Sequence, residues 1–228
     1  MKVFGRVLKD HFTGRQKSKL WLHNSYGKPE DMPVDVFFRS ETELSELEKI
    51  ALNLCSGTTL DIGAGVGSHA LYLQKKGIEV TAIEHSVQAC EIMRARGVKN
   101  VINMNVMQYS DKRYDTLLMM MNGIGLCEDV KGLHKFLDHL KNLLSPEGQV
   151  IFDSSDIAYL YEPDDFLMNK YYGEISYQFE YQNIKGSWFK WLYIDFPKLS
   201  RLAEEHGWAS EMIYEDDTDQ YLARLRLI

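Results

Sequence analysis

Short apolar runs alternate with amphipathic stretches through the middle of the chain, and this alternation predicts an α/β fold. Strands that alternate with helices in this way form a parallel sheet with helices on both of its faces. The apolar runs that predict buried strands are residues 59–62, 79–84, 101–106, 114–121 and 149–153. The stretches with apolar residues at helical spacing are residues 40–54, 70–76, 88–96 and 131–144.

One later segment departs from this alternation. Residues 171–194 alternate polar and apolar positions on both sides of a turn, which predicts a β-hairpin inserted after the fifth strand. Residues 209–214 and 220–227 predict two further strands, so that the sheet has seven strands in all. We therefore expect one α/β domain over residues 40–228 that carries a hairpin insertion.

The N-terminal segment, residues 1–39, has a different character. It combines a short amphipathic helix, a stretch rich in turn formers at 24–33 and a short extended piece at 34–39. Ser40 then provides a hydroxyl cap for the helix that opens the main domain. We expect residues 1–39 to be an N-terminal segment that precedes that domain.

Composition and charge narrow the classes of function. The 228 residues are 45% hydrophobic and 26% charged, as in soluble globular domains with a sizeable core. The net charge of −7 comes without a basic patch, so we expect no nucleic-acid partner. No apolar run approaches the roughly 18 residues of a membrane span, and no signal segment follows Met1. The three cysteines show no paired or metal-type spacing, so we expect reduced thiols in a cytoplasmic protein and no metal site. We expect the protein to be a monomer or a homodimer.

The connection between the first strand of the sheet and the helix after it is rich in glycine. Gly63, Gly65 and Gly67 stand at alternate positions, and Asp61 lies two residues before the first of them. Without Cβ atoms such a turn can touch a ligand, while the free N–H groups of the first helical turn point at it. The dinucleotide fingerprint G-x-G-x-x-G requires its third glycine where this chain has Ser68. A nicotinamide or flavin site is therefore disfavoured.

A second acidic residue ends the next strand. Glu84 lies 23 residues beyond Asp61, near the roughly 20-residue spacing at which a βαβ unit brings a carboxylate to a ribose. A carboxylate that accepts from two neighbouring hydroxyls makes charge-assisted hydrogen bonds of about 1.5–3 kcal/mol each. The glycines, the leading Asp and the trailing Glu therefore predict a site for a ligand that contains ribose.

The pattern Asp-x-Gly-x-Gly-x-Gly after a strand resembles motif I of the class I S-adenosylmethionine-dependent methyltransferases, and the resemblance covers residues 40–156. It implies a Rossmann-like, seven-stranded, mostly parallel sheet with an antiparallel last strand. It also implies S-adenosylmethionine as cofactor and S-adenosylhomocysteine as product. It further implies that the N-terminal segment, residues 1–39, lies over the ligand site of the domain as a lid and contributes to the choice of acceptor.

The resemblance assigns roles to single residues. Asp61 would orient the loop or meet the methionine amino group, Glu84 would hold the ribose and Asn105 would bond the adenine edge. Asn105 stands where the family usually has Asp, and a plain turn residue is the alternative. The cofactor-binding set implied in this way is Asp61, Gly63, Ala64, Gly65, Gly67, Glu84, His85, Asn105, Val106 and Asn122.

Candidates on the acceptor side come from three places: the N-terminal segment, the ends of the fourth and fifth strands, and the aromatic residues of the hairpin. Surface helix and loop is the alternative for the N-terminal residues, and strand packing is the alternative for the aromatic ones. Asp153 and Asp156 could hold a cationic acceptor or accept a proton, although Asp156 could equally cap the turn that follows. The substrate candidates are His11, Tyr26, Arg39, Gly123, Asp153, Asp156, Tyr172 and Trp191.

We therefore predict S-adenosylmethionine-dependent methyl transfer to a small-molecule acceptor by in-line displacement. No catalytic residue is assigned, because alignment supplies much of the rate and a carboxylate or thiolate acceptor needs no base. The alternatives are a non-catalytic S-adenosylmethionine-binding module and a nicotinamide-dependent Rossmann oxidoreductase. A nucleic-acid base methyltransferase is disfavoured, because residues 122–126 lack the Asn/Asp-Pro-Pro-Tyr/Phe motif.

Overall fold

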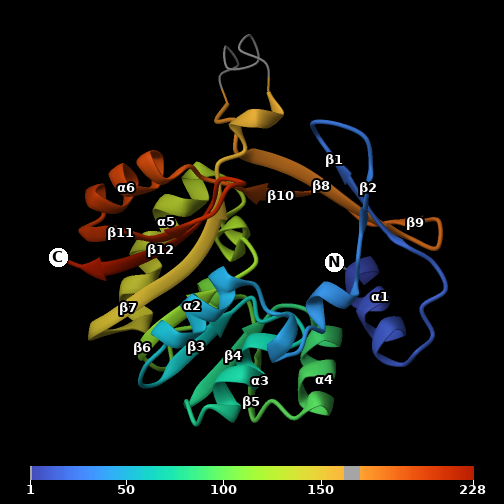
Figure 1. Cartoon of the computed structure of the whole chain (residues 1–228), viewed down its shortest axis with the longest axis horizontal. Coiled ribbons are helices and arrows are strands. Elements are labelled where there is room, and N and C mark those ends of the chain that lie inside the picture. Colours follow the sequence, from blue (N-terminus) through green and yellow to red (C-terminus); the bar gives the residue numbers. More distant parts are fainter. Residues whose placement is uncertain (1, 162–169) are drawn as a thin grey trace.

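The centre of the protein is a seven-stranded sheet in the order β11-β12-β7-β6-β3-β4-β5 (Figure 1). The computed structural model describes residues 2–161 and 170–228. The parallel strands are β3 (Thr59–Ile62), β4 (Val80–Glu84), β5 (Asn100–Asn103), β6 (Tyr114–Met119) and β7 (Leu144–Ser155). The last strand, β12 (Gln220–Leu227), runs antiparallel to β7 and to β11 (Trp208–Glu215). The predicted Rossmann-like fold is thus confirmed.

Helices cover both faces of this sheet, because its strands carry apolar side chains on both sides. Along β6, Leu117 belongs to the core cluster on one face and Leu118 to the cluster on the other, and both are fully buried. The first face is covered by α5 (Val130–Leu143) and α6 (Phe196–Glu205). The second face is covered by α2 (Glu46–Leu54), α3 (Ser68–Lys75) and α4 (Val87–Arg96).

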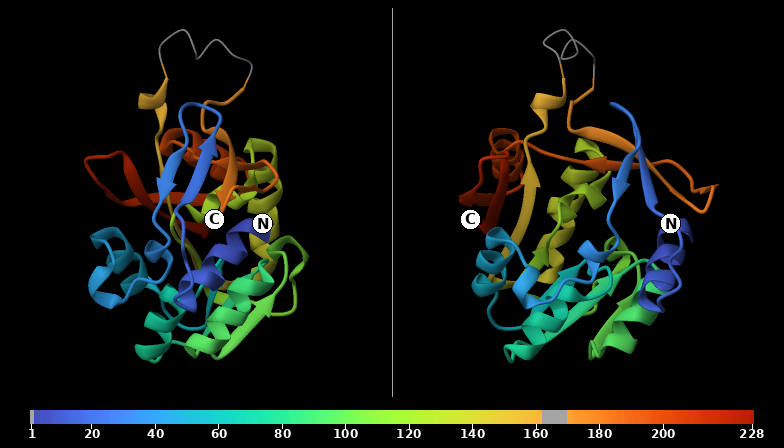
Figure 2. Two further views of the ribbon diagram at one scale, coloured as in Figure 1. Left: turned by 90° about the vertical axis from the view of Figure 1, so that its right-hand side faces the viewer. Right: turned by 45° about the vertical axis from the view of Figure 1, so that its right-hand side comes forward.

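A second, five-stranded antiparallel sheet has the order β10-β8-β1-β2, with β9 paired to β8. Its strands are β1 (Leu20–Asn24), β2 (Glu30–Met32), β8 (Glu174–Tyr181), β9 (Ile184–Lys185) and β10 (Phe189–Leu192). In Figure 1 this sheet lies at the upper right, beside the seven-stranded sheet, and the right-hand view of Figure 2 shows it from another side. The predicted hairpin therefore exists as β8 paired with β9 and β10, and the other edge of β8 pairs with β1 of the N-terminal segment.

The N-terminal segment is more ordered than its composition indicated. α1 (Lys2–Phe12) packs its buried face, which includes Val7 and Leu8, against α4. The stretch expected to be a loop contains β2, and the piece expected to be extended contains a 3-10 turn, η1 (Asp35–Phe37). Both expectations were wrong. β2 completes its hydrogen bonds with β1, and β1 in turn pairs with β8, more than a hundred residues away in the chain, so the sequence pattern of residues 24–33 alone does not indicate a strand.

The helix predicted to begin after Ser40 is divided in two. Ser40 forms a capping box with Glu43 on a single 3-10 turn, η2 (Glu41–Glu43), and Leu44 is extended. Ser45 then forms a second capping box with Glu48 at the start of α2. Two adjacent Ser-x-x-Glu patterns compete for the same helix start, and the second one begins the helix.

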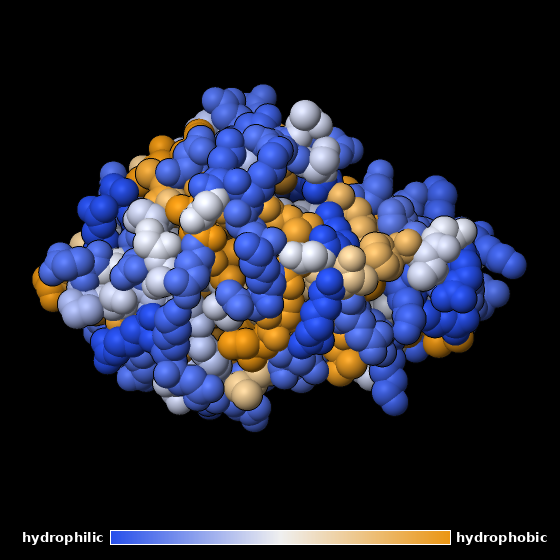
Figure 3. All heavy atoms as spheres, turned by 90° about the horizontal axis from the view of Figure 1, so that it is seen from below, coloured by the Kyte–Doolittle hydropathy of each residue, from blue (hydrophilic) through white to orange (hydrophobic). Residues whose placement is uncertain are grey.

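The remaining 3-10 turns are η3 (Val106–Gln108), η4 (Gly123–Cys127) and η5 (Ala158–Leu160). They follow β5, β6 and β7 in turn, at the carboxyl edge of the parallel strands. Seen from below, the surface is mostly hydrophilic, with hydrophobic groups gathered chiefly near its centre (Figure 3). No helix among the described residues is long and apolar enough to cross a membrane.

Candidate functional site

The glycine-rich connection between β3 and α3 forms an open cradle. Gly63, Gly65 and Gly67 have φ of 70°, 55° and 85°, a region that favours glycine. Added Cβ atoms on Gly63 and Gly65 would meet nothing within 4 Å, so the space in front of these two residues is free for a ligand. Gly67 differs, because a Cβ there would lie 2.8 Å from Val98 Cγ2 and 2.9 Å from Met93 Cγ. The third glycine therefore serves the packing of the loop against its neighbours.

Asp61 lies near the end of β3, directly before this cradle. Its side chain is buried, and its Oδ2 atom has no hydrogen-bond partner among the described residues. Burial raises the pKa of Asp61 to about 6; nearby His69 works against this shift and Glu84 adds to it. An unsatisfied buried carboxylate oxygen costs free energy. The position therefore suits a ligand that brings a cationic donor.

Glu84 ends β4, beside the same cradle. One of its oxygens accepts from the Gly65 N–H at 3.1 Å and the other accepts from the Ser86 N–H at 2.7 Å. These bonds hold the carboxylate in place, while burial raises its pKa. A carboxylate has about four lone-pair sites, so it can still accept from two hydroxyls. Asn103 of β5 adds support that the sequence did not reveal, by donating to the backbone oxygens of Glu84 and His85 at 2.9 and 3.0 Å.

The connection after β5 holds the residues predicted for the adenine. Asn105 is exposed and caps η3, since its Oδ1 accepts from the Met107 N–H at 2.9 Å. It is thus a turn residue, and this oxygen keeps a second lone pair for a ligand. Val106 is buried, and His85 is exposed at the end of the neighbouring strand. Met104 and Met107 leave apolar surface exposed beside Asn105.

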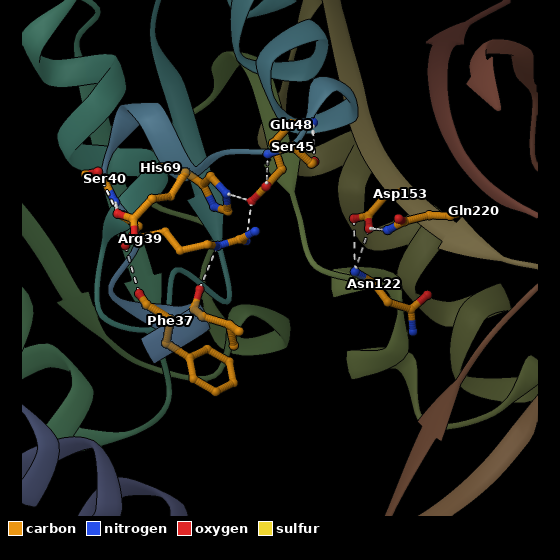
Figure 4. A network of polar contacts seen from close by, with 12 residues as sticks. Phe37, Arg39, Ser40, Ser45, Glu48, His69, Asn122, Asp153 and Gln220 are labelled. Atoms are coloured by element: carbon orange, nitrogen blue, oxygen red, sulfur yellow. Dashed lines mark hydrogen bonds and ion pairs between the residues drawn. The ribbon is translucent and has the colours of Figure 1, made fainter. Parts of the chain in front are cut away.

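A second polar group lies across from the cradle, at the carboxyl ends of β6 and β7 (Figure 4). The Asn122 N–H donates to both oxygens of buried Asp153, at 3.0 and 2.9 Å, and Gln220 donates to Asp153 at 2.8 Å. The Asn122 side chain donates to the Leu192 carbonyl at 3.1 Å and accepts from Ser154 Oγ at 2.9 Å. Burial raises the pKa of Asp153 to about 6. Asp153 and Asn122 therefore fix the strand ends and the start of η4.

Arg39, Glu48 and His69 form a buried polar group on the other side of the same space (Figure 4). Glu48 Oε1 accepts from Arg39 Nη2 at 2.5 Å and lies 2.8 Å from His69 Nε2, while Glu48 Oε2 accepts from the Ser45 N–H at 2.8 Å. Burial alone would raise the pKa of Glu48. The hydrogen bonds from His69 and Ser45 have the larger combined effect, and the pKa is lowered to about 2. Sequence reasoning missed Glu48 and His69, because the Ser45 capping box accounts for Glu48 on local grounds alone.

Two N-terminal acceptor candidates contact other residues of the N-terminal segment. The His11 ring stacks on Phe38 at 4.6 Å, and its Nδ1 lies 2.7 Å from Gln16 Oε1. The Tyr26 hydroxyl donates to Glu30 at 2.9 Å, at the end of the β1–β2 hairpin.

The other candidates lie near η4 and the end of β7. Trp191 covers Gly125 so closely that an added Cβ would lie 2.1 Å from Trp191 Nε1, and Gly123 packs on Met119. The Tyr172 hydroxyl donates to Asp156 at 2.8 Å. Asp156 also accepts from the Ala158 N–H at 2.9 Å, which is the capping role left open by the sequence.

Comparison with known proteins identifies the class that this fold and loop define. A family model described as a methyltransferase domain matches residues 37–210, and the chain therefore belongs to the methyltransferase domain family. An S-adenosylmethionine-dependent methyltransferase from Bacteroides fragilis, solved in complex with S-adenosyl-L-homocysteine, is 39% identical with a TM-score of 0.91. The match covers 99% of this chain and 94% of that one. The protein is thus an S-adenosylmethionine-dependent methyltransferase.

More distant structures share the fold alone. The CcbJ methyltransferase from Streptomyces caelestis is 14% identical with a TM-score of 0.63, over 79% of this chain and 88% of that one. The glycopeptide N-methyltransferase MtfA, complexed with S-adenosyl-L-methionine, is 16% identical with a TM-score of 0.57, over 84% of this chain and 96% of that one. No curated protein matches the chain.

Proposed function

We propose that this methyltransferase acts on a small-molecule acceptor. The observation that carries the proposal is the position of β10, whose end is tied across the carboxyl edge of the large sheet. Asn122 donates to the Leu192 carbonyl at 3.1 Å, and the Ile194 N–H donates to Ser154 Oγ at 3.1 Å. The five-stranded sheet therefore covers the edge from which an acceptor must approach the cofactor. A covered edge suits a small molecule better than the surface of a folded macromolecule.

The residues around the cradle fit S-adenosylmethionine. The unpartnered Asp61 oxygen would accept from the ammonium group of its methionine part, and the open backbone at Gly63, Ala64 and Gly65 would let it approach closely. Glu84 would accept from the ribose hydroxyls. The next turn, with Asn105 and Val106, would border the adenine, while His85 and Asn122 would lie at the rim. Gly67 would support the loop from behind.

The chemistry asks little of the protein beyond placement. The cofactor supplies a methyl group that is already activated on a sulfonium. The protein aligns the acceptor for in-line displacement, to a separation of about 3–3.5 Å, and keeps water out. Among the substrate candidates, Trp191, Gly123 and Tyr172 would border the acceptor, whereas Asp153 would act through the backbone that it holds.

Calorimetric titration with S-adenosylmethionine, S-adenosylhomocysteine and NADH tests the cofactor site. We expect the first two to bind and NADH to release no heat. A second experiment uses a labelled methyl donor with separated metabolite, protein and RNA fractions. Label in the metabolite fraction supports a small-molecule acceptor, and label confined to protein or RNA contradicts it.

A further inference from the structure

The five-stranded sheet has one polar face and one face that is mainly apolar. Strand register places on one face, called here the aromatic face, the residues Leu22, Tyr177, Phe179, Phe189 and Trp191. The other face carries charged and polar residues together with the exposed Trp21, and it includes the His23–Glu180 pair at 2.6 Å. A sheet with this pattern keeps its apolar face turned toward the rest of the molecule.

The aromatic face is docked at both ends. Tyr177 is buried, while Phe179, Phe189 and Trp191 are half-buried. At one end, Phe4 of α1 stacks on Phe179 at 4.8 Å. At the other end, Trp191 lies directly over Gly125. Between these contacts Phe189 stacks on Phe179 at 5.1 Å, and it keeps part of its ring exposed. The half-buried rings of Phe179, Phe189 and Trp191 offer apolar surface against which a flat apolar molecule can pack.

The charged side chains at the carboxyl edge of the large sheet are mainly acidic. The carboxylates of Asp61, Glu84, Asp153 and Asp156 all belong to the carboxyl ends of the parallel strands. Asp61 has one buried oxygen without a hydrogen-bond partner in the described part of the chain. Arg39, the nearby cation, is already bound to Glu48. A second arginine near the loop, Arg96 of α4, donates to backbone carbonyls instead. An anionic acceptor would be repelled by this distribution of charge, and a cation would be attracted.

We propose that the acceptor is an amine carried on a flat apolar body, with the body packed against the aromatic face. The inference rests on the proposed small-molecule function and adds the chemical class of the acceptor. An acceptor attracted in its ammonium form first gives its proton to water. The neutral amine nitrogen then forms the new N–C bond while the electrons of the S–C bond pass to sulfur. The product amine takes over the positive charge and then releases one proton to water. The charge at the reacting centre stays positive throughout, which the surrounding carboxylates stabilise.

Mass spectrometry with a deuterated methyl donor tests this inference directly. The protein is incubated with S-adenosylmethionine that carries a CD3 group and with a metabolite extract. The labelled products are then separated by cation exchange. We expect the label on nitrogen, in ultraviolet-absorbing products that the resin retains. Label on a carboxylate, phenol or thiol would overturn the amine inference while the small-molecule function stands. An absence of labelled metabolite, despite cofactor binding, would overturn both.

A matched pair of variants tests the aromatic face. Phe189→Ala removes a half-buried ring from the face, whereas Trp21→Ala removes an exposed ring from the opposite face of the same sheet. A contact between aromatic rings of this kind strengthens binding by up to about tenfold. We therefore expect Phe189→Ala to raise the KM for the acceptor about tenfold. Affinity for S-adenosylhomocysteine should stay unchanged in both variants, and Trp21→Ala should keep the parental KM. Equal effects of the two variants on KM would contradict the binding of the acceptor against the aromatic face.

Discussion

Replacing Glu84 by Gln is the sharpest test of where the ribose binds. The variant keeps the size of the side chain but removes the charge that would strengthen two hydrogen bonds to vicinal hydroxyls. In the parent, Glu84 accepts from the Gly65 and Ser86 N–H groups at 3.1 and 2.7 Å. The amide retains one oxygen, so one of these two contacts survives and the other faces an NH2 group.

The expected loss follows from these contacts. Hydrogen bonds to an ionised group contribute about 1.5–3 kcal/mol each, so weakening two of them costs about 3 kcal/mol, or about a hundredfold in Kd. Folding should be affected much less. Burial raises the pKa of Glu84, which means that the ionised carboxylate costs free energy in the folded state. The removal of this buried charge in Glu84→Gln therefore offsets the stability that is lost with one backbone hydrogen bond.

Calorimetry with S-adenosylhomocysteine measures the change in Kd, and thermal unfolding of the cofactor-free protein measures stability. Glu79→Gln is the matched control, since Glu79 lies just before β4 and pairs with Lys112 at 2.8 Å on the surface. An exposed pair of this kind contributes little, so this variant should bind as the parent does. If Glu84→Gln bound within a few-fold of the parent, the ribose would have to lie elsewhere.

Three further predictions concern the loop and its acidic neighbour. Gly65→Ala should weaken cofactor binding in calorimetry, because the φ of 55° disfavours alanine and the Cβ would enter the free space of the cradle. Gly67→Ala should instead destabilise the fold, because its Cβ would lie 2.8 Å from Val98 Cγ2. The free energy of unfolding should fall by about 1–3 kcal/mol, and the thermal unfolding midpoint should fall with it. Titrations across pH should show affinity for S-adenosylmethionine falling as the pH drops through about 6, where buried Asp61 becomes protonated. Without cofactor, the stability contributed by Asp61 should change in the opposite sense, rising as the pH falls from about 6 to about 4, because the neutral acid tolerates burial better.

The central sheet was predictable because its signals are local. Each parallel strand is a short apolar run, and each crossover helix has an amphipathic repeat, so the period of the pattern identifies the element. The five-stranded sheet was not predictable in the same way. β1 and β2 are short, and the pairing of β1 with β8 depends on residues far away in the chain. A sequence pattern shows where a strand could form, but it does not show which partner completes its hydrogen bonds.

The same distinction applies to the site. Asp61, the glycines and Glu84 lie within one βαβ unit, so their spacing in the sequence determines their spacing in the fold. Glu48 and His69 come from different elements and meet only because α2 packs beside α3 on the sheet. Asp153 was grouped with the acceptor candidates because the sequence shows its position at a strand end. It does not show that the Asn122 N–H would occupy both carboxylate oxygens.

Three consecutive residues of the N-terminal segment are anchored around the glycine loop. Ser68 Oγ, in the place of the dinucleotide motif's third glycine, donates to the Phe37 carbonyl at 2.8 Å. Arg96 donates to the Phe38 carbonyl at 3.4 Å and to the Val66 carbonyl within the loop at 2.8 Å. The Arg96 guanidinium also lies 5.4 Å from the centre of the Phe38 ring.

The next residue, Arg39, extends this set of contacts to the other side of the loop, where it meets Glu48 and, through it, His69. The glycines that leave the cradle open also leave it flexible, since glycine restricts the backbone least. Contacts from outside the loop must therefore hold its shape before the cofactor arrives. Ser68 supplies one of them at the position where a dinucleotide-binding loop needs a glycine. Ser68 in place of a glycine thus distinguishes this loop from a dinucleotide-binding loop, and it also has a structural role, because its hydroxyl connects the N-terminal segment to the cofactor loop.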